Sequence, residues 1–459
     1  MKRSWILVAV LVVAAAAAAG AWRMSACRAW TTDSPAALEL YEQGRQAQMK
    51  FYWQDAGALF ERALELDPQF VAARLALLET DKPSREERQR LIAELRTADR
   101  SRLTDRERFL LDLKLAEADG DAERRRREIE AYSRAHPKDP WVLMIVATDA
   151  WNRTDWEPAE RHYKELLETD PNWVVARNNL GYMAMAQGRF EEAEAQFRTY
   201  RYSAPDQANP HDSLGELLVL LGRYDEARAE LEEAVAVRPD FCASYGNLFS
   251  LAILERRAAD LEPLRARVAQ HCDEHWAHEF ECRVPIGEAF LARATELDWQ
   301  ALLDRCPELM KWNDPLTHAV ALRTGRPDVA SAIEGRARAA AEKSDEYTTR
   351  RGKDVRALVA LLEGQRLLAE GRSADAAARL REVEEDSVWW GAGGAGLFKL
   401  VARLHLATAL SRIGDEAGAQ AILARLRAVN PQFADTFAGF DVTPEPSAEG
   451  RGAAGLPGS

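Results

Sequence analysis

A repeat of 34 residues in the middle of the chain constrains its fold more than any other feature. The block that starts at Val174 and the block after it both carry Leu-Gly, Gly-Arg-aromatic, Ala and Pro at matching places. Proline marks the register, at Pro137, Pro171, Pro205 and Pro239. A period of this length is typical of stacked helical repeats. The sequence therefore predicts one helical unit that is used many times.

Each block has the pattern of two helices joined by a turn. Apolar residues keep helical spacing before and after Gly188, and glycine tolerates the backbone conformation of such a turn. Pro205 lacks the N–H that a continuing helix needs, so the second helix ends before it. The small residues Gly181 and Ala193 would let the two backbones approach closely. One pair cannot bury its apolar faces alone, so neighbouring pairs must stack.

These blocks, from 174 to 241, resemble the tetratricopeptide repeat, whose Leu-Gly, mid-repeat Gly-x-aromatic, Ala and final Pro they follow. The resemblance implies an all-α fold, a right-handed solenoid of antiparallel helix pairs. We expect the solenoid over 37–309, with a clean register from about 106, and degenerate or C-terminal helix pairs over 310–433. The segment from Ala37 to about Trp151 also resembles the repeat-built sensor regions of some bacterial transcription regulators and protein kinases.

Residues 1–22 have the pattern of a targeting segment. Two basic residues precede eighteen uncharged ones, Trp5 to Trp22, a length that suits a transmembrane helix. Ala19-Gly20-Ala21 also fits the cleavage site of a signal peptide, and the residues up to Cys27 faintly resemble a lipoprotein box. All three interpretations export the body of the protein. We expect a bacterial inner-membrane protein with its repeats in the periplasm, or alternatively a secreted soluble periplasmic protein.

Two further segments have no repeat pattern. Residues 23–36 are predicted to be a short polar linker. Residues 434–459 are rich in Pro, Gly, Ser and Ala and are predicted to be a disordered tail.

In proteins with this repeat, the first helices line a concave groove that holds an extended peptide or a partner helix. The resemblance implies such a groove at the matching places of four blocks, which are Trp141, Met144, Thr148, Asn178, Asn179, Tyr182, Asn209, Asp212, Ser213, Glu216, Asn247 and Ser250. Ordinary polarity of a solvated helix is the alternative for each of them. Members of the family that capture a carboxylate need Lys where Asn178 and Asp212 stand here, so a basic or neutral partner suits this chain better.

Histidine and cysteine gather in one segment. On an unbroken helix His271, His275, His278 and Cys282 would share one face, and these are ligands for a soft metal. Asp273 takes the slot that proline fills in other repeats, however, so we expect a turn there. We therefore predict no metal site and keep His275, His278 and Cys282 as the alternative. The spacing of the cysteines alone cannot choose their pairing.

The composition and motifs bound the function. The net charge of −13 argues against a protein that binds duplex nucleic acid, which usually carries a basic face. The sequence has neither a phosphate-binding glycine loop nor a nucleophile elbow, so we predict no catalysis and no cofactor. The sequence favours a noncatalytic scaffold of the cell envelope that binds a protein or peptide and touches the membrane only through its N-terminal segment. A ligand-sensing module is the alternative, and a metal-binding protein that uses the 271–282 cluster is a weaker one.

Overall fold

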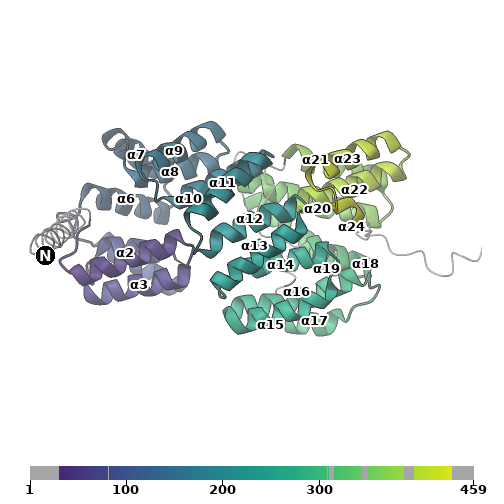
Figure 1. Ribbon diagram of the computed structural model, residues 1–459, viewed down its shortest axis with the longest axis horizontal. Coiled ribbons are helices and arrows are strands. Elements are labelled where there is room, and N and C mark those ends of the chain that lie inside the picture. The colour runs from purple at the N-terminus through teal and green to yellow at the C-terminus, as the bar shows by residue number, and fades with distance from the viewer. Residues whose placement is uncertain are drawn as a thin grey trace, which may run out of the picture. The chain divides into compact units, whose positions relative to one another are not determined.

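The computed structural model describes residues 30–80, 82–307, 309, 315–343, 350–386 and 397–436, and over these residues it contains helices and turns but no strand. The predicted targeting segment, the glycine-rich stretch around 391–396 and residues 437–459 of the predicted tail lie outside this range. Within the described residues, no helix combines the length and the apolar character that a membrane crossing requires. The fold is thus all-α, as the repeat pattern predicts (Figure 1).

The helices follow each other in antiparallel pairs (Figure 1). Their bounds are α2 Pro35–Met49, α3 Trp53–Leu66, α4 Val71–Leu78, α5 Arg85–Arg96, α6 Asp105–Asp119, α7 Ala122–Ala135, α8 Pro140–Asn152, α9 Trp156–Thr169, α10 Val174–Ala186, α11 Phe190–Ser203, α12 Ala208–Leu220, α13 Tyr224–Val237, α14 Ala243–Leu254, α15 Leu261–His271, α16 Glu274–Leu291, α17 Trp299–Arg305, α18 Pro315–Arg323, α19 Pro327–Lys343, α20 Arg350–Ala369, α21 Ser373–Asp386, α22 Leu397–Arg412, α23 Glu416–Val429 and α24 Phe433–Thr436. A short 3₁₀ helix, η1 Ala258–Asp260, precedes α15.

Prolines set the ends of the second helices. Pro171 stands two residues after α9 ends, and Pro205 and Pro239 stand two residues after α11 and α13 end. The same offset holds for Pro68 after α3 and Pro431 after α23. Because proline cannot donate the backbone hydrogen bond of a continuing helix, the helix stops before it. Proline thus stands at the same offset from the end of the second helix in all five of these pairs.

The turn inside a pair needs one residue with a left-handed backbone. Glycine provides it in several pairs, for example Gly188 with φ of 73° and Gly222 with φ of 74°. At the corresponding turns elsewhere the residue is Phe51, Thr154 or Arg256, each with positive φ. An L-residue there carries strain that glycine does not.

The described residues divide into two compact units. Unit 1 comprises the described residues up to Val146 together with Glu165–Val175, and unit 2 comprises Ala147–Lys164 together with the described residues from Ala176 onward. The division therefore passes through α8, α9 and α10.

Unit 1 begins earlier than the sequence pattern indicates. Trp30 lies in the predicted linker, yet its side chain is buried and its ring packs edge-on against Tyr41 at 5.1 Å. The backbone N–H of Thr31 donates to Glu107 at 2.7 Å, and the hydroxyl of Thr32 donates to Asp67 at 2.6 Å. The prediction of a linker over 23–36 is therefore wrong from Trp30 onward, because these residues pack onto α2, α3 and α6.

Unit 2 contains one hydrophobic core that runs from Ala184 to Ala434. The segment that follows α23 also contacts the turn between α12 and α13, near the beginning of this unit. Asn430, which is fully buried, donates from Nδ2 to the hydroxyl of Tyr224 at 3.2 Å and lies 3.4 Å from the carbonyl of Val219. Gln432 donates to the carbonyl of Gly222 at 2.6 Å. Segments about 210 residues apart in sequence are thus joined, and we call this contact the Asn430 closure.

The predicted start of the tail is also slightly early. Phe433 and Ala434 are buried, and α24 extends to Thr436. These residues are ordered because the Phe433 side chain joins the core of unit 2.

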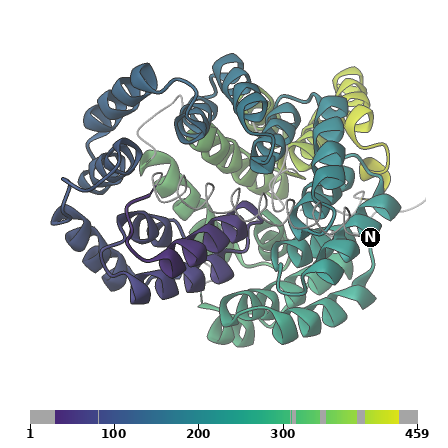
Figure 2. The ribbon, with the colours of Figure 1, turned by 60° about the vertical axis from the view of Figure 1, so that its left-hand side comes forward.

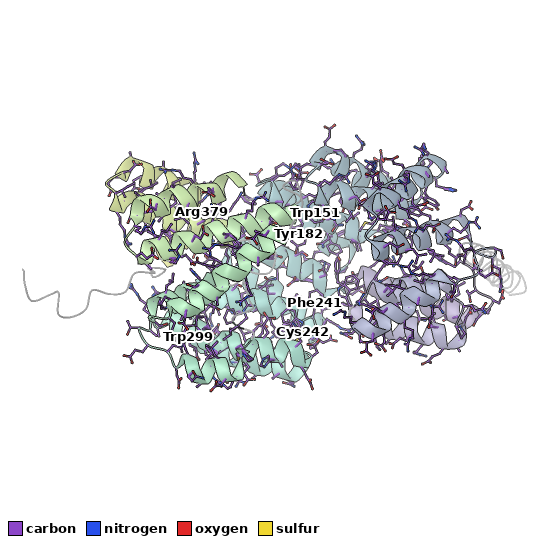
Figure 3. All side chains as sticks on the ribbon, turned by 180° about the vertical axis from the view of Figure 1, so that it is seen from behind. Trp151, Tyr182, Phe241, Cys242, Trp299 and Arg379 are labelled. Atoms are coloured by element: carbon purple, nitrogen blue, oxygen red, sulfur yellow. A yellow bond between two sulfur atoms is a disulfide. The ribbon has the colours of Figure 1, made fainter. Side chains whose placement is uncertain are left out.

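Two disulfides hold the region from α14 to α17. Cys242 pairs with Cys272, and Cys282 pairs with Cys306. Cys242 is labelled in Figure 3, just before α14. The first bridge joins the start of α14 to the residue after α15, and the second joins α16 to the residue after α17.

Candidate functional site

The polar residues predicted to line a groove form a hydrogen-bonded ladder between first helices of unit 2. Ser213 on α12 donates to the side-chain oxygen of Asn178 on α10 at 2.9 Å. One block further along, Asn247 on α14 donates to Asp212 on α12 at 3.0 Å, and Ser244 donates to the same oxygen at 2.7 Å. Counted from the start of each 34-residue block, Asn178 and Asp212 are fifth residues, and Ser213 and Asn247 are sixth residues of the blocks that follow. The same pair of positions is therefore bonded in two successive blocks. These bonds fix the register of neighbouring first helices.

The ladder is buried, which corrects the prediction that its members face a partner. Six predicted groove residues are at least 92% shielded from solvent: Asn178, Asn209, Asp212, Ser213, Glu216 and Asn247. Every residue of α12 is buried, and α12 packs against α11, α13 and α14. Polar side chains tolerate such burial when they have hydrogen-bond partners, and outside the ladder Asn209 bonds the hydroxyl of Tyr200 and Glu216 that of Tyr182. Sequence spacing places these residues correctly on the first helices, but it does not show what covers them.

Burial sets the electrostatics of the ladder. Loss of solvent raises the pKa of Asp212, and the hydrogen bonds from Ser244 and Asn247 only partly oppose this. The hydroxyl of Tyr182 donates to Glu216 at 2.8 Å, and burial together with the charges of Glu216 and Asp212 raises the pKa of that hydroxyl. Because Asp212 is enclosed in this way, it no longer argues for a basic partner.

Four of the predicted residues keep part of their surface in solvent within unit 2, and three of them lie close together: Thr148 on α8, and Asn179 and Tyr182 on α10. The hydroxyl of the buried Tyr163 on α9 lies 3.1 Å from the hydroxyl of Thr148, and it accepts from the amide of Asn179 at 3.1 Å. Tyr182, labelled in Figure 3, packs edge-on against Phe197. These three partly exposed residues form the main group of predicted groove residues that a partner can reach in unit 2.

The remaining predicted residues lie apart from this group. Ser250, partly exposed on α14, donates to the carbonyl of Gly246 on its own helix at 3.0 Å. Met144 is partly exposed in unit 1. Trp141, also in unit 1, belongs to an aromatic cluster, because its ring packs edge-on against Trp30 and Trp173, at 5.6 and 5.7 Å.

Trp30 is the member of this aromatic cluster that sequence analysis missed. It lies in the predicted linker outside any repeat, so the 34-residue period gives no sign of it. An isolated tryptophan in an otherwise polar stretch is the one signal that could have identified it. The guanidinium of Arg45 lies 4.1 Å above the Trp141 ring, so this tryptophan is enclosed by the chain's own side chains.

The histidine and cysteine segment is divided between two helices. The helix α15 ends at His271, and Asp273 caps the start of α16 by accepting from the backbone of Trp276. The turn predicted at Asp273 is confirmed, so the face that His271 would share with His275, His278 and Cys282 does not form.

The structure assembles a different group from this region. His278, Cys282 and Cys306 offer ligand atoms that all lie within 4.8 Å of one another, and among the described residues this is the group with such an arrangement. His275 is not part of it, and Cys306 arrives from the end of α17. The position of Cys306 beside His278 and Cys282 could not be predicted from the sequence, because it depends on how α17 is positioned relative to α16.

A second buried polar cluster joins α18, α19, α20 and α22. His318 Nδ1 lies 2.8 Å from Gln365 Oε1, and His318 Nε2 lies 3.3 Å from Glu334 Oε1. Gln365 Nε2 lies 3.3 Å from His405 Nε2. Burial alone would raise the pKa of Glu334, but the hydrogen bond with His318 and the charges of Arg366 and Arg338 lower it overall. This cluster ties the later helix pairs together, and sequence analysis missed it.

Unit 1 contains a cavity of about 610 Å³ beside the segment that follows Trp30. Its lining is mostly polar and includes Thr31, Asp33, Asp67, Arg74, Glu94 and Arg102. Two ion pairs join residues of this lining, Arg102 with Asp33 at 2.6 Å and Arg74 with Glu94 at 3.0 Å. The volume lies in the range of small-molecule sites in proteins.

The stacked helix pairs and the cross-helix ladder define a helical-repeat protein. A family model described as "Tetratricopeptide repeat" matches residues 210–241, which cover most of α12 and all of α13. The chain therefore contains the tetratricopeptide repeat that its sequence pattern predicts, and the family model assigns it at residues 210–241.

Comparison with other proteins adds distant neighbours. No curated protein matches the sequence. A crystal structure of a tetratricopeptide repeat protein from Parabacteroides merdae ATCC 43184 is similar at 13% identity and a TM-score of 0.38, covering 57% of this chain and 98% of that one. A crystal structure of the APC/C hetero-tetramer Cut9–Hcn1 is similar at 14% identity and a TM-score of 0.45, covering 88% of this chain and 75% of that one. Similarity at this level does not define a shared partner.

Proposed function

We propose that the protein is a noncatalytic scaffold that binds a protein or peptide partner along the inner face of a right-handed helical solenoid. The observation that carries this is the partly exposed group of Thr148, Asn179 and Tyr182, which borders the buried ladder of unit 2 because the Tyr182 hydroxyl lies 3.3 Å from that of Ser213. The ladder fixes the helices below, so this surface is preorganised. An amide such as that of Asn179 can both donate to and accept from an extended peptide backbone.

Site-specific photocrosslinking in intact cells tests this surface. A photoreactive residue at Asn179 is expected to give one discrete covalent adduct, identified by mass spectrometry. The same residue at Glu191, which is exposed on α11, is the matched control and is expected to give none. Adducts of equal yield at both positions, or none at Asn179, would contradict a partner on this face.

We also propose that this scaffold works in the bacterial cell envelope, with residues 1–22 as its anchor or its signal. Two disulfides support an oxidising compartment, because disulfides persist outside the reducing cytosol. Fractionation of cells, followed by the mass of the purified mature chain, distinguishes an intact anchor, cleavage after Ala21 and lipid attachment at Cys27. Recovery of the uncleaved chain in the soluble cytoplasm would overturn the proposal.

A ligand-sensing module is a second candidate, and the cavity of unit 1 favours it. That cavity lies in the segment that resembles repeat-built sensor regions, and its ionic lining suits a small polar molecule. A panel of small polar metabolites is expected to contain one that raises the melting temperature of the wild-type chain. Ala98→Trp places a ring at the cavity wall and should abolish that shift. A shift that survives in Ala98→Trp would place the ligand elsewhere.

A further inference from the structure

The strongest unexplained feature is the group formed by His278, Cys282 and Cys306. His278 and Cys282 lie one helical turn apart on α16, so their side chains emerge on the same face. His278 Nε2 lies 3.8 Å from the sulfur of Cys282. In a tetrahedral zinc site with sulfur and nitrogen ligands, neighbouring ligand atoms lie about 3.5–3.8 Å apart. The imidazole thus already stands at a coordinating distance from the sulfur.

The orientation of the imidazole adds an independent observation. While Nε2 faces the sulfurs, Nδ1 faces the carboxylate of Glu281 at 3.9 Å. A carboxylate behind the imidazole favours the tautomer that carries its proton on Nδ1, which leaves the lone pair of Nε2 toward the sulfurs. In metal sites a histidine commonly donates its other ring N–H to a carboxylate, and Glu281 lies on that side of the His278 ring, although beyond hydrogen-bond distance.

Burial and access also fit a metal. Cys282 and Cys306 are fully buried, so their thiolates would be shielded from competing water. The His278 side chain is 43% exposed and forms the entrance to the group. Two sulfurs and one imidazole are a ligand set that prefers a soft or borderline divalent cation, above all Zn²⁺.

We propose that these three residues form a Zn²⁺ site that exists only when the Cys282–Cys306 disulfide is reduced. A dithiol supplies two electrons and two protons, which break the S–S bond and leave two thiols, while the dithiol itself becomes a cyclic disulfide. Zn²⁺ then displaces both thiol protons into solvent and binds two thiolates and His278 Nε2. A disulfide oxidant, such as oxidised glutathione, then accepts two electrons from the thiolates and becomes two thiols with protons from solvent, while the Cys282–Cys306 bond reforms and the ion is released. The metal and the disulfide therefore exclude each other.

The test uses the full chain with Cys27, Cys242 and Cys272 replaced by serine, so that Cys282 and Cys306 are the only cysteines. The protein is reduced with dithiothreitol, which is then removed without oxygen, and Zn²⁺ is titrated against a chromophoric chelator. We expect one equivalent of tightly bound Zn²⁺ in the reduced chain and none in the oxidised chain. Co²⁺ in place of Zn²⁺ should give the absorption of a tetrahedral thiolate complex only after reduction.

Matched variants locate the ligands. His278→Ala should weaken Zn²⁺ binding about tenfold or more, and Cys282→Ser should abolish it. His275→Ala, one turn away on the same helix and exposed, should change nothing. Equal affinity in His278→Ala and His275→Ala, binding by the oxidised chain, or no binding after reduction would each overturn the proposal.

A second measurement covers the case in which the serine replacements unfold the chain. In the protein with its natural cysteines, reduced as above, bound Zn²⁺ should slow the alkylation of Cys282 and Cys306, read by peptide mapping. His278→Ala should remove that protection and His275→Ala should keep it. Alkylation at the same rate with and without Zn²⁺ would contradict the site.

Discussion

At the scale of single residues, one contact recurs through the chain. A glycine on the first helix meets a larger side chain on the second, sixteen positions later in each case. An added Cβ at Gly44 would stand 2.4 Å from Phe60, at Gly181 2.4 Å from Phe197, at Gly215 2.7 Å from Leu231 and at Gly364 2.5 Å from Leu380. The glycine is therefore required by the close approach of a ring or a leucine.

Gly181→Ala should lower the free energy of unfolding by about 1–3 kcal/mol, because the new methyl group collides with the Phe197 ring. Gly246→Ala is the matched control, since Gly246 lies inside α14 with nothing near its added Cβ. That variant should instead raise stability by about 0.5–1 kcal/mol through helix propensity. Urea unfolding of both variants checks the pair, and a loss of equal size in both would refute the close contact.

Asp212 gives a prediction about pH. Burial raises the pKa of its carboxyl above that of the unfolded chain, so the folded state holds the proton more tightly. The contribution of Asp212 to stability is thus lost as the pH rises from the unfolded pKa through the folded one. The melting temperature of wild type relative to Asp212→Asn should fall across that window, because asparagine keeps an acceptor and carries no charge.

Melting curves of wild type and Asp212→Asn at a series of pH values, from acidic to neutral, measure this trend. The exposed Asp225→Asn controls for the loss of one negative charge. A constant difference between wild type and Asp212→Asn at every pH would show that Asp212 is not enclosed as described.

At the scale of elements, the turn inside each helix pair fixes where one helix ends and the next begins. Gly371 takes the left-handed position between α20 and α21 with φ of 77°, and nothing lies near its added Cβ. Arg256 takes the same position after α14 with φ of 58°. The two turns have the same backbone but differ in strain.

Arg256→Gly should raise the free energy of unfolding by about 0.5–1 kcal/mol, because relief of the left-handed strain exceeds the added freedom of the unfolded chain. Gly371→Ala should lower it by about 1 kcal/mol for the opposite reason. Thermal or urea unfolding of the two variants tests the assignment. Changes of the same sign would mean that the two turns are not equivalent.

The elements also show what the sequence could and could not predict. Helix ends were predictable because Pro205, Gly188 and Asp273 act on the backbone locally. The burial of Asp212 was not, since it depends on Ser244 and Asn247 in the next block and on the helices packed around α12. Pairings between distant segments leave no periodic trace, so neither the cysteine partners nor the Asn430 closure could be read from spacing.

At the scale of the whole molecule, each unit has its own core, and the Asn430 closure distinguishes unit 2 from an open row of repeats. The Asn430 side chain fills the space beside Gly222, where an added Cβ would stand 2.4 Å from its oxygen. The Asn430 side chain also accepts from the backbone N–H of Phe433, which stabilises the turn between α23 and α24. One residue thus connects the last helices to the turn between α12 and α13.

Asn430→Ala should lower the free energy of unfolding by about 1–3 kcal/mol, since the hydroxyl of Tyr224 and the backbone of Phe433 lose a buried partner. Asn152→Ala is the control, because Asn152 is exposed at the end of α8. Hydrogen exchange should also quicken at residues 219–224 in Asn430→Ala alone. Unchanged exchange there would mean that the contact does not persist in solution.

The same contact limits how this protein can vary in length. An open array of repeats can gain or lose one copy, because each copy needs only its two neighbours. A helix pair added or deleted between Gly222 and Asn430 would move the segment around Asn430 away from the turn at Gly222. Gly222 and Tyr224 would then lose their contacts with Gln432 and Asn430. This part of the chain therefore behaves as a unit of set size, in which insertions are tolerated at turns but whole copies are not.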